Sequence, residues 1–231
     1  MVEGLRLLTL GAPFQGASRH IDKEFTVSHD ATLQVADLDA GLIYRLFSGA
    51  IAPRPIAWVS TLSSEGHANL APFSFFNVAS VAPPILAFSP LLNGEGGTKD
   101  TVANLREVGE CIVHIGGEAL AEALNTTSAS LPRNGDEFKH AGLTKARLGD
   151  LRVPRISEAP IAFGCRLHDI LTFGDQPLSG NLVLAEVTVI HADPKVWDGR
   201  HVGREALAPI GRMAGSDYIR CTDLFALERP K

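Results

Sequence analysis

Residues 51–89, IAPRPIAWVSTLSSEGHANLAPFSFFNVASVAPPILAFS, decide the fold class of this chain. The stretch holds little charge and places β-branched and aromatic residues between turn signals, a pattern typical of consecutive strands. It predicts three strands, at 56–62, at about 69–78 and at 85–89. The small, Gly-bearing SSEGH segment at 63–67 predicts a hairpin between the first two.

The segments that follow predict few helices and several more strands. DLDAGLIYRLFS predicts a helix over 37–48 with Asp37 as its cap. KDTVANLREVGE predicts a second, capped by Thr98 or Asp100 and ended by Gly109, and a third is expected at 118–125. Strands are expected in CIVHIG and at 162–172 and 182–191. Many short strands with few helices indicate a mainly β barrel.

The chain of 231 residues is long enough for one large domain. Residues 1–30 mix Gly, Pro and scattered charge without a sustained period, so we predict an N-terminal arm there and a single domain over 31–231. The polar, Pro- and Gly-punctuated segment 126–144 predicts a long surface loop that covers a site.

Composition excludes several classes of function. The formal net charge is −5 and no basic block is present, which argues against nucleic acid or an anionic membrane as partner. The three cysteines form no CxxC pair, and the eight histidines form no HExxH motif, so a metal site has little support. No stretch is apolar for about 18 residues. We therefore expect a cytoplasmic protein without a metal.

Two groups of polar residues could hold a phosphorylated, flat ligand. Thr98, Lys99, Asp100 and Thr101 begin a helix after a glycine-rich loop, where amides, hydroxyls and an ammonium suit a phosphate. The alternative is an ordinary capped helix with a solvated Lys. Ser60, Thr61, Ser74 and Asn77 interrupt apolar strands, and buried polar groups need partners.

Strand alternation limits what the second group can do. It places Phe73, Phe75 and Asn77 on one face and Ser74 and Phe76 on the other, so some contacts to a ligand would be made by backbone groups. The alternative for the aromatic residues, Trp58 and Phe88 included, is core packing. The single histidines, His67, His114, His168 and His191, are more often structural than catalytic.

Six motifs in order carry a resemblance to a known family: RPIAWVST, NLAPFSFFN, APPILAFS, KDTVANL, NTTSASLPRNGDEFKHAGLT and GRMAGSDY. Over about residues 40–225 the chain resembles the flavin reductase-like family of FMN-binding split β-barrels. It looks most like the branch of flavoredoxins and of reductase components such as that of nitrilotriacetate monooxygenase. The resemblance implies a split β-barrel with Greek-key topology and a homodimer that binds FMN near its interface.

The resemblance also implies site residues. The positions that match the family's flavin-binding segments are Arg54, Trp58, Ser60, Thr61, Phe73, Ser74, Phe75, Phe76, Asn77, Lys99, Asp100 and Thr101. Lys99 to Thr101 would approach the FMN phosphate. Arg212 and Tyr218 match a C-terminal signature near the pocket mouth, where Arg212 could meet the nicotinamide nucleotide or stabilise the dimer, and a structural ion pair is the alternative. No residue is expected to act as a catalytic acid or base.

The implied activity is that of an NAD(P)H-dependent FMN reductase that supplies reduced flavin to a partner monooxygenase. The chain departs from relatives at His114, where Asn is frequent, and at Gly174, Asp175 and Gln176, where many reductases have Gly-Asp-His. One alternative is therefore a flavoredoxin-like electron carrier that keeps FMN without NAD(P)H turnover. Another is a binding module that has lost its flavin.

Overall fold

The computed structural model describes residues 32–230. The arm predicted for residues 1–30 lies outside the described residues. The chain divides into two compact units, Met1–Leu38 and Asp39–Lys231. Of the first unit, the structure describes a short 3-10 turn, η1 (Val35–Asp37).

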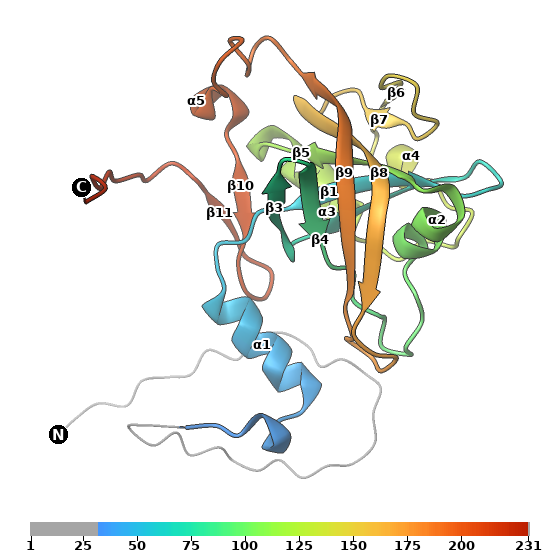
Figure 1. The fold of residues 1–231 in the computed structure, drawn as a ribbon, viewed down its shortest axis with the longest axis vertical. Coiled ribbons are helices and arrows are strands. Elements are labelled where there is room, and N and C mark those ends of the chain that lie inside the picture. Colours follow the sequence, from blue (N-terminus) through green and yellow to red (C-terminus); the bar gives the residue numbers. More distant parts are fainter. Residues whose placement is uncertain (1–31, 231) are drawn as a thin grey trace. The chain divides into compact units, whose positions relative to one another are not determined.

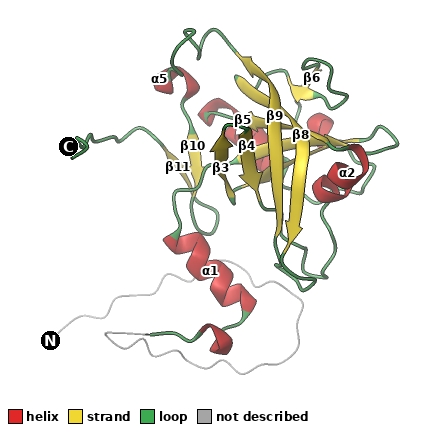
Figure 2. Cartoon of the chain, viewed as in Figure 1, coloured by secondary structure: helices red, strands yellow, loops and turns green. Residues whose placement is uncertain are grey.

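The second unit is built on a seven-stranded antiparallel sheet (Figures 1 and 2). The strand order is β2-β1-β5-β8-β9-β4-β3. Its longest pair is the β8–β9 hairpin. The strands are β1 (Ala57–Leu62), β2 (Ala68–Phe73), β3 (Phe76–Val81), β4 (Pro84–Phe88), β5 (Glu110–Ile115), β8 (Ile161–Thr172) and β9 (Asn181–Ala192).

Residues 51–89 form four strands rather than the three predicted. The stretch predicted as one strand over 69–78 is split after Phe73, which pairs with Ala57 at one edge of the sheet. Phe76, at the start of the next strand, pairs with Phe88 at the opposite edge. Because consecutive strands occupy the two edges, the sheet must curl so that its edges approach, as in an incompletely closed barrel. The alternation predicted over 69–78 is broken at this turn, because Phe73 and Phe76, which it places on opposite faces, both pack against the same apolar cluster.

The two edge strands of the sheet, β2 and β3, differ in how far other residues cover them. Along β2, the Glu137 carboxylate accepts a hydrogen bond from the amide of Leu70 at 3.1 Å and so covers part of that edge. Burial raises the pKa of Glu137. Among residues 32–230, strand β3 pairs only with β4, and its Val78 and Val81 are 58% and 84% exposed.

The three predicted helical segments begin close to where the sequence places them, the first two with different caps. The short helices α4 and α5 were not predicted, and α4 lies within 126–144, which was predicted as a loop. α1 starts after Asp39, whose carboxylate accepts from the amide of Leu42, and Asp37 instead lies in the preceding 3-10 turn. α2 follows Lys99 as its N-cap residue, without a capping side-chain bond from Thr98 or Asp100, and ends at Gly109 in the left-handed region as predicted. The helices and the second 3-10 turn are α1 (Ala40–Ala50), α2 (Asp100–Val108), η2 (Glu118–Leu120), α3 (Ala121–Thr126), α4 (Glu137–His140) and α5 (Arg204–Leu207).

Two short strand pairs complete the unit outside the large sheet. β6 pairs with β7 and β10 pairs with β11. Their bounds are β6 (Lys145–Ala146), β7 (Arg155–Ile156), β10 (Ile210–Arg212) and β11 (Tyr218–Arg220). Among residues 32–230, no helix is long and apolar enough to cross a membrane.

Strand β1 separates two apolar clusters because its side chains alternate between faces. Ala57 and Val59 pack with Leu105 of α2 inside the curled sheet. Trp58 packs with Leu124 and Phe138 on the other face, under α3 and α4. The polar residues of β1 are distributed between the same two faces.

Candidate functional site

Trp58 and Ser60 of β1 are fully buried and already have partners. The indole Nε1 of Trp58 donates to the Thr127 hydroxyl at 2.8 Å. The Ser60 hydroxyl donates to the carbonyl of Pro154 at 2.8 Å. Both side chains are 0% exposed, so in this conformation they stabilise the outer layer of the barrel.

Arg54 ties three separate segments together. Its Nη1 donates to the carbonyls of Ser48 and Ile51 at 2.6 and 2.8 Å, and its Nη2 to the carbonyl of Met213 at 2.9 Å. Its Nε donates to the Ser74 hydroxyl at 3.3 Å. Burial lowers the pKa of Arg54. Through these bonds Arg54 fixes the end of α1 and the β2–β3 turn.

Thr61 lies on the inner face of β1 in a polar cluster that sequence reasoning did not assemble. The Asn69 amide group donates to the hydroxyls of Thr61 and Thr101 at 3.2 and 3.0 Å. The Asn104 amide group donates to Thr61 at 3.1 Å. The Asn104 side-chain oxygen is buried without a hydrogen-bond partner within residues 32–230. Such an atom costs free energy unless a water or ligand supplies a donor.

The N-terminus of α2 lies beside this cluster and is open. Neither the Asp100 nor the Thr101 amide donates to a residue in the described part of the chain, and the N-cap Lys99 makes no capping bond. By contrast, Asp39 and Asp136 cap α1 and α4 with their carboxylates. Free amides at the positive end of a helix dipole favour an anion.

The two charged residues at this helix start differ in their availability. The Lys99 side chain is exposed and has no ion-pair or hydrogen-bond partner among residues 32–230. The Asp100 carboxylate accepts from Arg133 at 3.0 Å, and Arg133 also binds Glu107. Arg133 belongs to the predicted covering loop, so this pair holds the loop against α2.

The aromatic residues of the β2–β3 turn are partly buried. Phe73 stacks on Phe88 with ring centroids 5.8 Å apart. Phe75 lies 6.2 Å from the Tyr44 ring and 5.9 Å from the Arg54 guanidinium. Phe76 packs at the margin of the inner cluster. These rings leave an apolar surface on which a flat ligand could rest.

Asn77 is exposed at the open edge of the sheet. Its side-chain oxygen accepts from the amide of Val78 at 2.8 Å. Within the described part of the chain β3 pairs on one side only, so the peptide groups on its other side are available to a ligand or a partner.

Arg212 and Tyr218 face each other across the β10–β11 hairpin. The Arg212 guanidinium lies 4.6 Å from the centre of the Tyr218 ring and donates to the carbonyls of Asp217 and Gly215. The Tyr218 hydroxyl donates to Asn125 at 3.2 Å. The pair therefore connects this hairpin with α3.

His114 is a structural residue. It is 0% exposed, and its Nε2 accepts from the amide of Ile156 at 3.0 Å while its Nδ1 lies 2.8 Å from the carbonyl of Trp58. An acceptor at Nε2 and a donor at Nδ1 require the neutral ring. Burial, the largest cause, lowers its pKa to about 4.

Sequence reasoning missed Asn69, Asn104 and Arg133. An Asn inside a strand and another on the buried face of a helix are polar interruptions of an apolar pattern, and that signal could have marked the first two. Arg133 gave no signal, because its partners lie 33 and 26 residues away. Within the described residues no cluster of His, Cys, Asp or Glu could hold a metal ion.

The residues present fit a phosphorylated flavin. The open helix start with Lys99 suits a phosphate dianion, and the partnerless oxygen of Asn104 suits a hydroxyl or N–H donor. The partly buried rings of Phe73 and Phe75 suit a flat apolar ring.

Known proteins match the chain over most of its length. The family described as "Flavin reductase like domain" matches residues 49–204. An uncharacterized protein of Bacillus subtilis is 40% identical over 201 residues, which are 85% of this chain and 98% of that protein. Component B of nitrilotriacetate monooxygenase from Bacillus cereus has a TM-score of 0.81 and 32% identity, with 87% of this chain and 100% of that chain covered.

More distant structures share the fold. A 2-nitrobenzoate 2-nitroreductase of Pseudomonas fluorescens has a TM-score of 0.77 and 29% identity, covering 87% of this chain and 96% of that chain. A protein with a split barrel domain from Shewanella frigidimarina, 18% identical, has a TM-score of 0.71 over 84% of this chain and 96% of that chain. Flavoredoxin of Desulfovibrio vulgaris, also 18% identical, has a TM-score of 0.65 over 76% and 90%. The fold is the predicted split barrel, and the chain belongs to the flavin reductase-like family.

Proposed function

We propose that this flavoprotein is an NAD(P)H-dependent FMN reductase that supplies reduced flavin to a partner monooxygenase. The observation that carries the proposal is the uncapped start of α2 beside the partnerless oxygen of Asn104. In a chain of this family, hydrogen bonds to these unsatisfied groups would contribute most to the binding of a phosphorylated flavin. The likeness to a monooxygenase component B supports the partner.

Lys99 and the amides of Asp100 and Thr101 would hold the FMN phosphate. The amides are oriented by the helix, so no reorganisation is needed when the anion binds. Thr101 also holds Asn69 through its hydroxyl and so fixes the start of α2 against β2. Asn104 would accept a hydrogen bond from a ligand hydroxyl or ring N–H.

The ring of FMN would lie against the β2–β3 turn. Ser74, held by Arg54, and the free peptide groups of β3 beside Asn77 would meet its polar edge, while Phe73, Phe75 and Phe76 limit access of water. Trp58, Ser60 and Thr61 would support this surface from within β1. When bound, FMN supplies hydride acceptance at its N5 position, and the protein aligns the nicotinamide with it.

Arg212 and Tyr218 would border the nicotinamide side of the site. Their stacked pair presents a guanidinium at the edge of the β10–β11 hairpin, and Arg is well suited to a nucleotide phosphate.

The alternative function is an electron carrier that keeps FMN and has no NAD(P)H turnover. It is favoured by Gln176, which replaces the His of the Gly-Asp-His found in many reductases and is exposed in the β8–β9 connection. The fold it shares with a flavoredoxin is compatible with both functions. A barrel without flavin is the third hypothesis, in which water satisfies Asn104.

An absorbance spectrum before and after anaerobic addition of NADH or NADPH separates these functions. A reductase bleaches the flavin band within seconds and oxidises excess nicotinamide when FMN and air are added. A carrier is yellow as purified and stays oxidised with either nicotinamide, but is bleached by dithionite. Colourless protein that leaves the spectrum of added FMN unchanged would exclude both.

We also propose that the protein is a homodimer. α1 exposes Tyr44 and Phe47, Ile51 is exposed just after it, and β3 exposes Val78 and Val81. Large exposed apolar side chains favour a protein partner. Light scattering should give about twice 24.6 kDa, and Phe47→Glu should shift the mass toward the monomer.

A further inference from the structure

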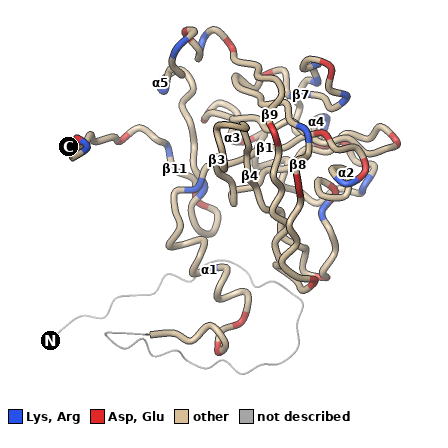
Figure 3. Tube along the Cα trace, in the orientation of Figure 1, with Lys and Arg blue, Asp and Glu red and all other residues tan. Residues whose placement is uncertain are grey.

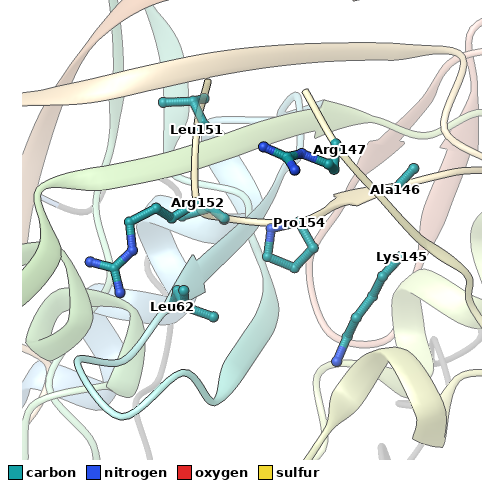
Figure 4. A pocket seen from close by; sticks show the side chains of 8 residues that line it. Leu62, Lys145, Ala146, Arg147, Leu151, Arg152 and Pro154 are labelled. Atoms are coloured by element: carbon teal, nitrogen blue, oxygen red, sulfur yellow. The ribbon is translucent and has the colours of Figure 1, made fainter. Parts of the chain in front are cut away.

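A pocket of about 580 Å³ opens on the face of β1 that points away from the Thr61 cluster (Figure 4). Thr61 and Leu62 are neighbours in a strand, so their side chains lie on opposite faces. Leu62 lines the pocket, whereas Thr61 binds Asn69 and Asn104. The volume lies in the range of small-molecule sites.

The floor of the pocket is apolar and held in place. It is formed by Leu62, Leu151, Val153 and Pro154. Leu151 and Val153 are 2% and 1% exposed. The carbonyl of Pro154 is fixed by the Ser60 hydroxyl. Because Leu151 and Val153 are almost fully buried, a flat apolar group would meet mainly the half-buried Leu62 and Pro154.

The rim is cationic. Lys145, Arg147 and Arg152 surround Pro154 in Figure 4, and Figure 3 shows several Lys and Arg positions along the trace near β7, with an acidic position among them. No Asp or Glu lines the pocket among the described residues. In a protein with a formal net charge of −5, this is a local exception.

The two arginines of the rim have no carboxylate to neutralise them. Among residues 32–230, neither the Arg147 nor the Arg152 guanidinium makes a hydrogen bond or ion pair, whereas Lys145 binds Asp136 at 2.7 Å. The carboxylates of Glu110 and Asp150 bind a different arginine, Arg166, at 3.1 and 3.3 Å. The Arg147 and Arg152 side chains are exposed, and in Figure 4 their guanidinium groups lie apart, so at least one must turn toward the other to hold the carboxylate of an aromatic ligand.

We infer that this pocket binds a small aromatic carboxylate, separately from the flavin. The ring lies on Leu62 and Pro154, and the carboxylate is held by Arg147 and Arg152. The inference does not depend on the proposed function, because the pocket shares no residue with the start of α2.

Calorimetric titration with 2-naphthoate tests the site. We expect one site per chain, weaker binding at higher salt, and at least tenfold weaker binding of the neutral analogue 2-naphthalenemethanol. The double variant Arg147→Ala/Arg152→Ala should bind 2-naphthoate at least tenfold more weakly. Lys195→Ala/Arg200→Ala, which removes the same charge from exposed side chains elsewhere, should bind as the wild type does.

FMN provides the second arm of the test. Saturation with FMN should leave 2-naphthoate binding unchanged, and the arginine double variant should keep its affinity for FMN and its urea unfolding midpoint. Absence of 2-naphthoate binding, equal loss in both double variants, or displacement by FMN would overturn the inference.

Discussion

Strand β1 and the start of α2 both carry polar residues that match flavin-binding segments. Those of β1 are hydrogen-bonded within the protein, whereas groups at the start of α2 have no partner in the described part of the chain. In β1, Trp58 and Ser60 are fully buried and bonded to Thr127 and Pro154. At α2, Lys99 is exposed and the first amides of the helix donate to no residue in the described part of the chain. A polar residue in an apolar strand thus marks an internal partner as readily as a ligand. Unsatisfied groups are the better guide to a site.

The largest effect on stability is expected from substituting a buried, hydrogen-bonded residue of β1. Trp58→Ala should lower the free energy of unfolding by about 3 to 5 kcal/mol, because it leaves a cavity in the outer cluster. Urea denaturation measures this change. If the variant is too unstable to purify, Trp58→Phe, which removes the indole bond and part of the ring, should lower it by at least about 1 kcal/mol. Unchanged stability with lost FMN binding would place Trp58 against the ligand instead.

Substitutions at the start of α2 should change the affinity for FMN rather than the stability of the protein. Lys99→Ala should weaken FMN binding by about 1 to 3 kcal/mol, the range for a charge-assisted hydrogen bond. Its unfolding free energy should stay within about 0.5 kcal/mol of wild type, as is usual for an exposed residue. Flavin fluorescence titration gives the affinity. The exposed Lys195→Ala is the matched control, and an equal loss in both variants would contradict a phosphate site at Lys99.

The pH dependence of stability should report on the buried His114, whose ring lies 2.8 Å from the Trp58 carbonyl of β1. Its pKa is about 4 in the folded protein, against an ordinary value of 6.5 for an unfolded chain. Below pH 6.5 the unfolded chain therefore binds a proton that the folded protein does not, so this stability is complete above pH 6.5 and is lost as the pH falls toward 4. Between about pH 7 and pH 5 the loss should be about 2 kcal/mol.

Urea unfolding at half-unit pH intervals measures the loss, and His114→Gln should remove most of the slope whatever its own stability. The exposed His140→Gln should keep it. An identical slope in wild type and His114→Gln would mean that other groups, such as the partly buried His191, cause it; burial lowers the pKa of His191 too.

The smallest effect is expected at Ser60, where stability and FMN affinity should respond differently. Ser60→Ala should lower the unfolding free energy by about 1 kcal/mol, since the Pro154 carbonyl loses its donor. FMN affinity should change less than twofold. A tenfold loss of FMN affinity at unchanged stability would show that Ser60 contacts the flavin.

The sequence predicted most strands, and the structure corrected the places where the chain changes direction and the faces assigned to Phe73 and Phe76. Strands over 56–62 and 162–172 agree within one residue with β1 and β8. The split at Ser74 and the cap at Asp39 were missed, because the first depends on pairing with distant strands and the second on a choice between two nearby aspartates. Local patterns do not encode such alternatives.

The family was predicted from the resemblance of six ordered motifs to known proteins, whereas the mainly β architecture and the positions of most strands follow from hydrophobic periodicity and turn residues. These are local properties, so one chain is enough to read them. Which polar groups already have partners is visible only in the folded chain: Thr127 lies 69 residues from Trp58, Pro154 lies 94 residues from Ser60, and Asn104 is left with a partnerless oxygen. Hydrogen bonding between residues so far apart depends on the packing of the whole barrel.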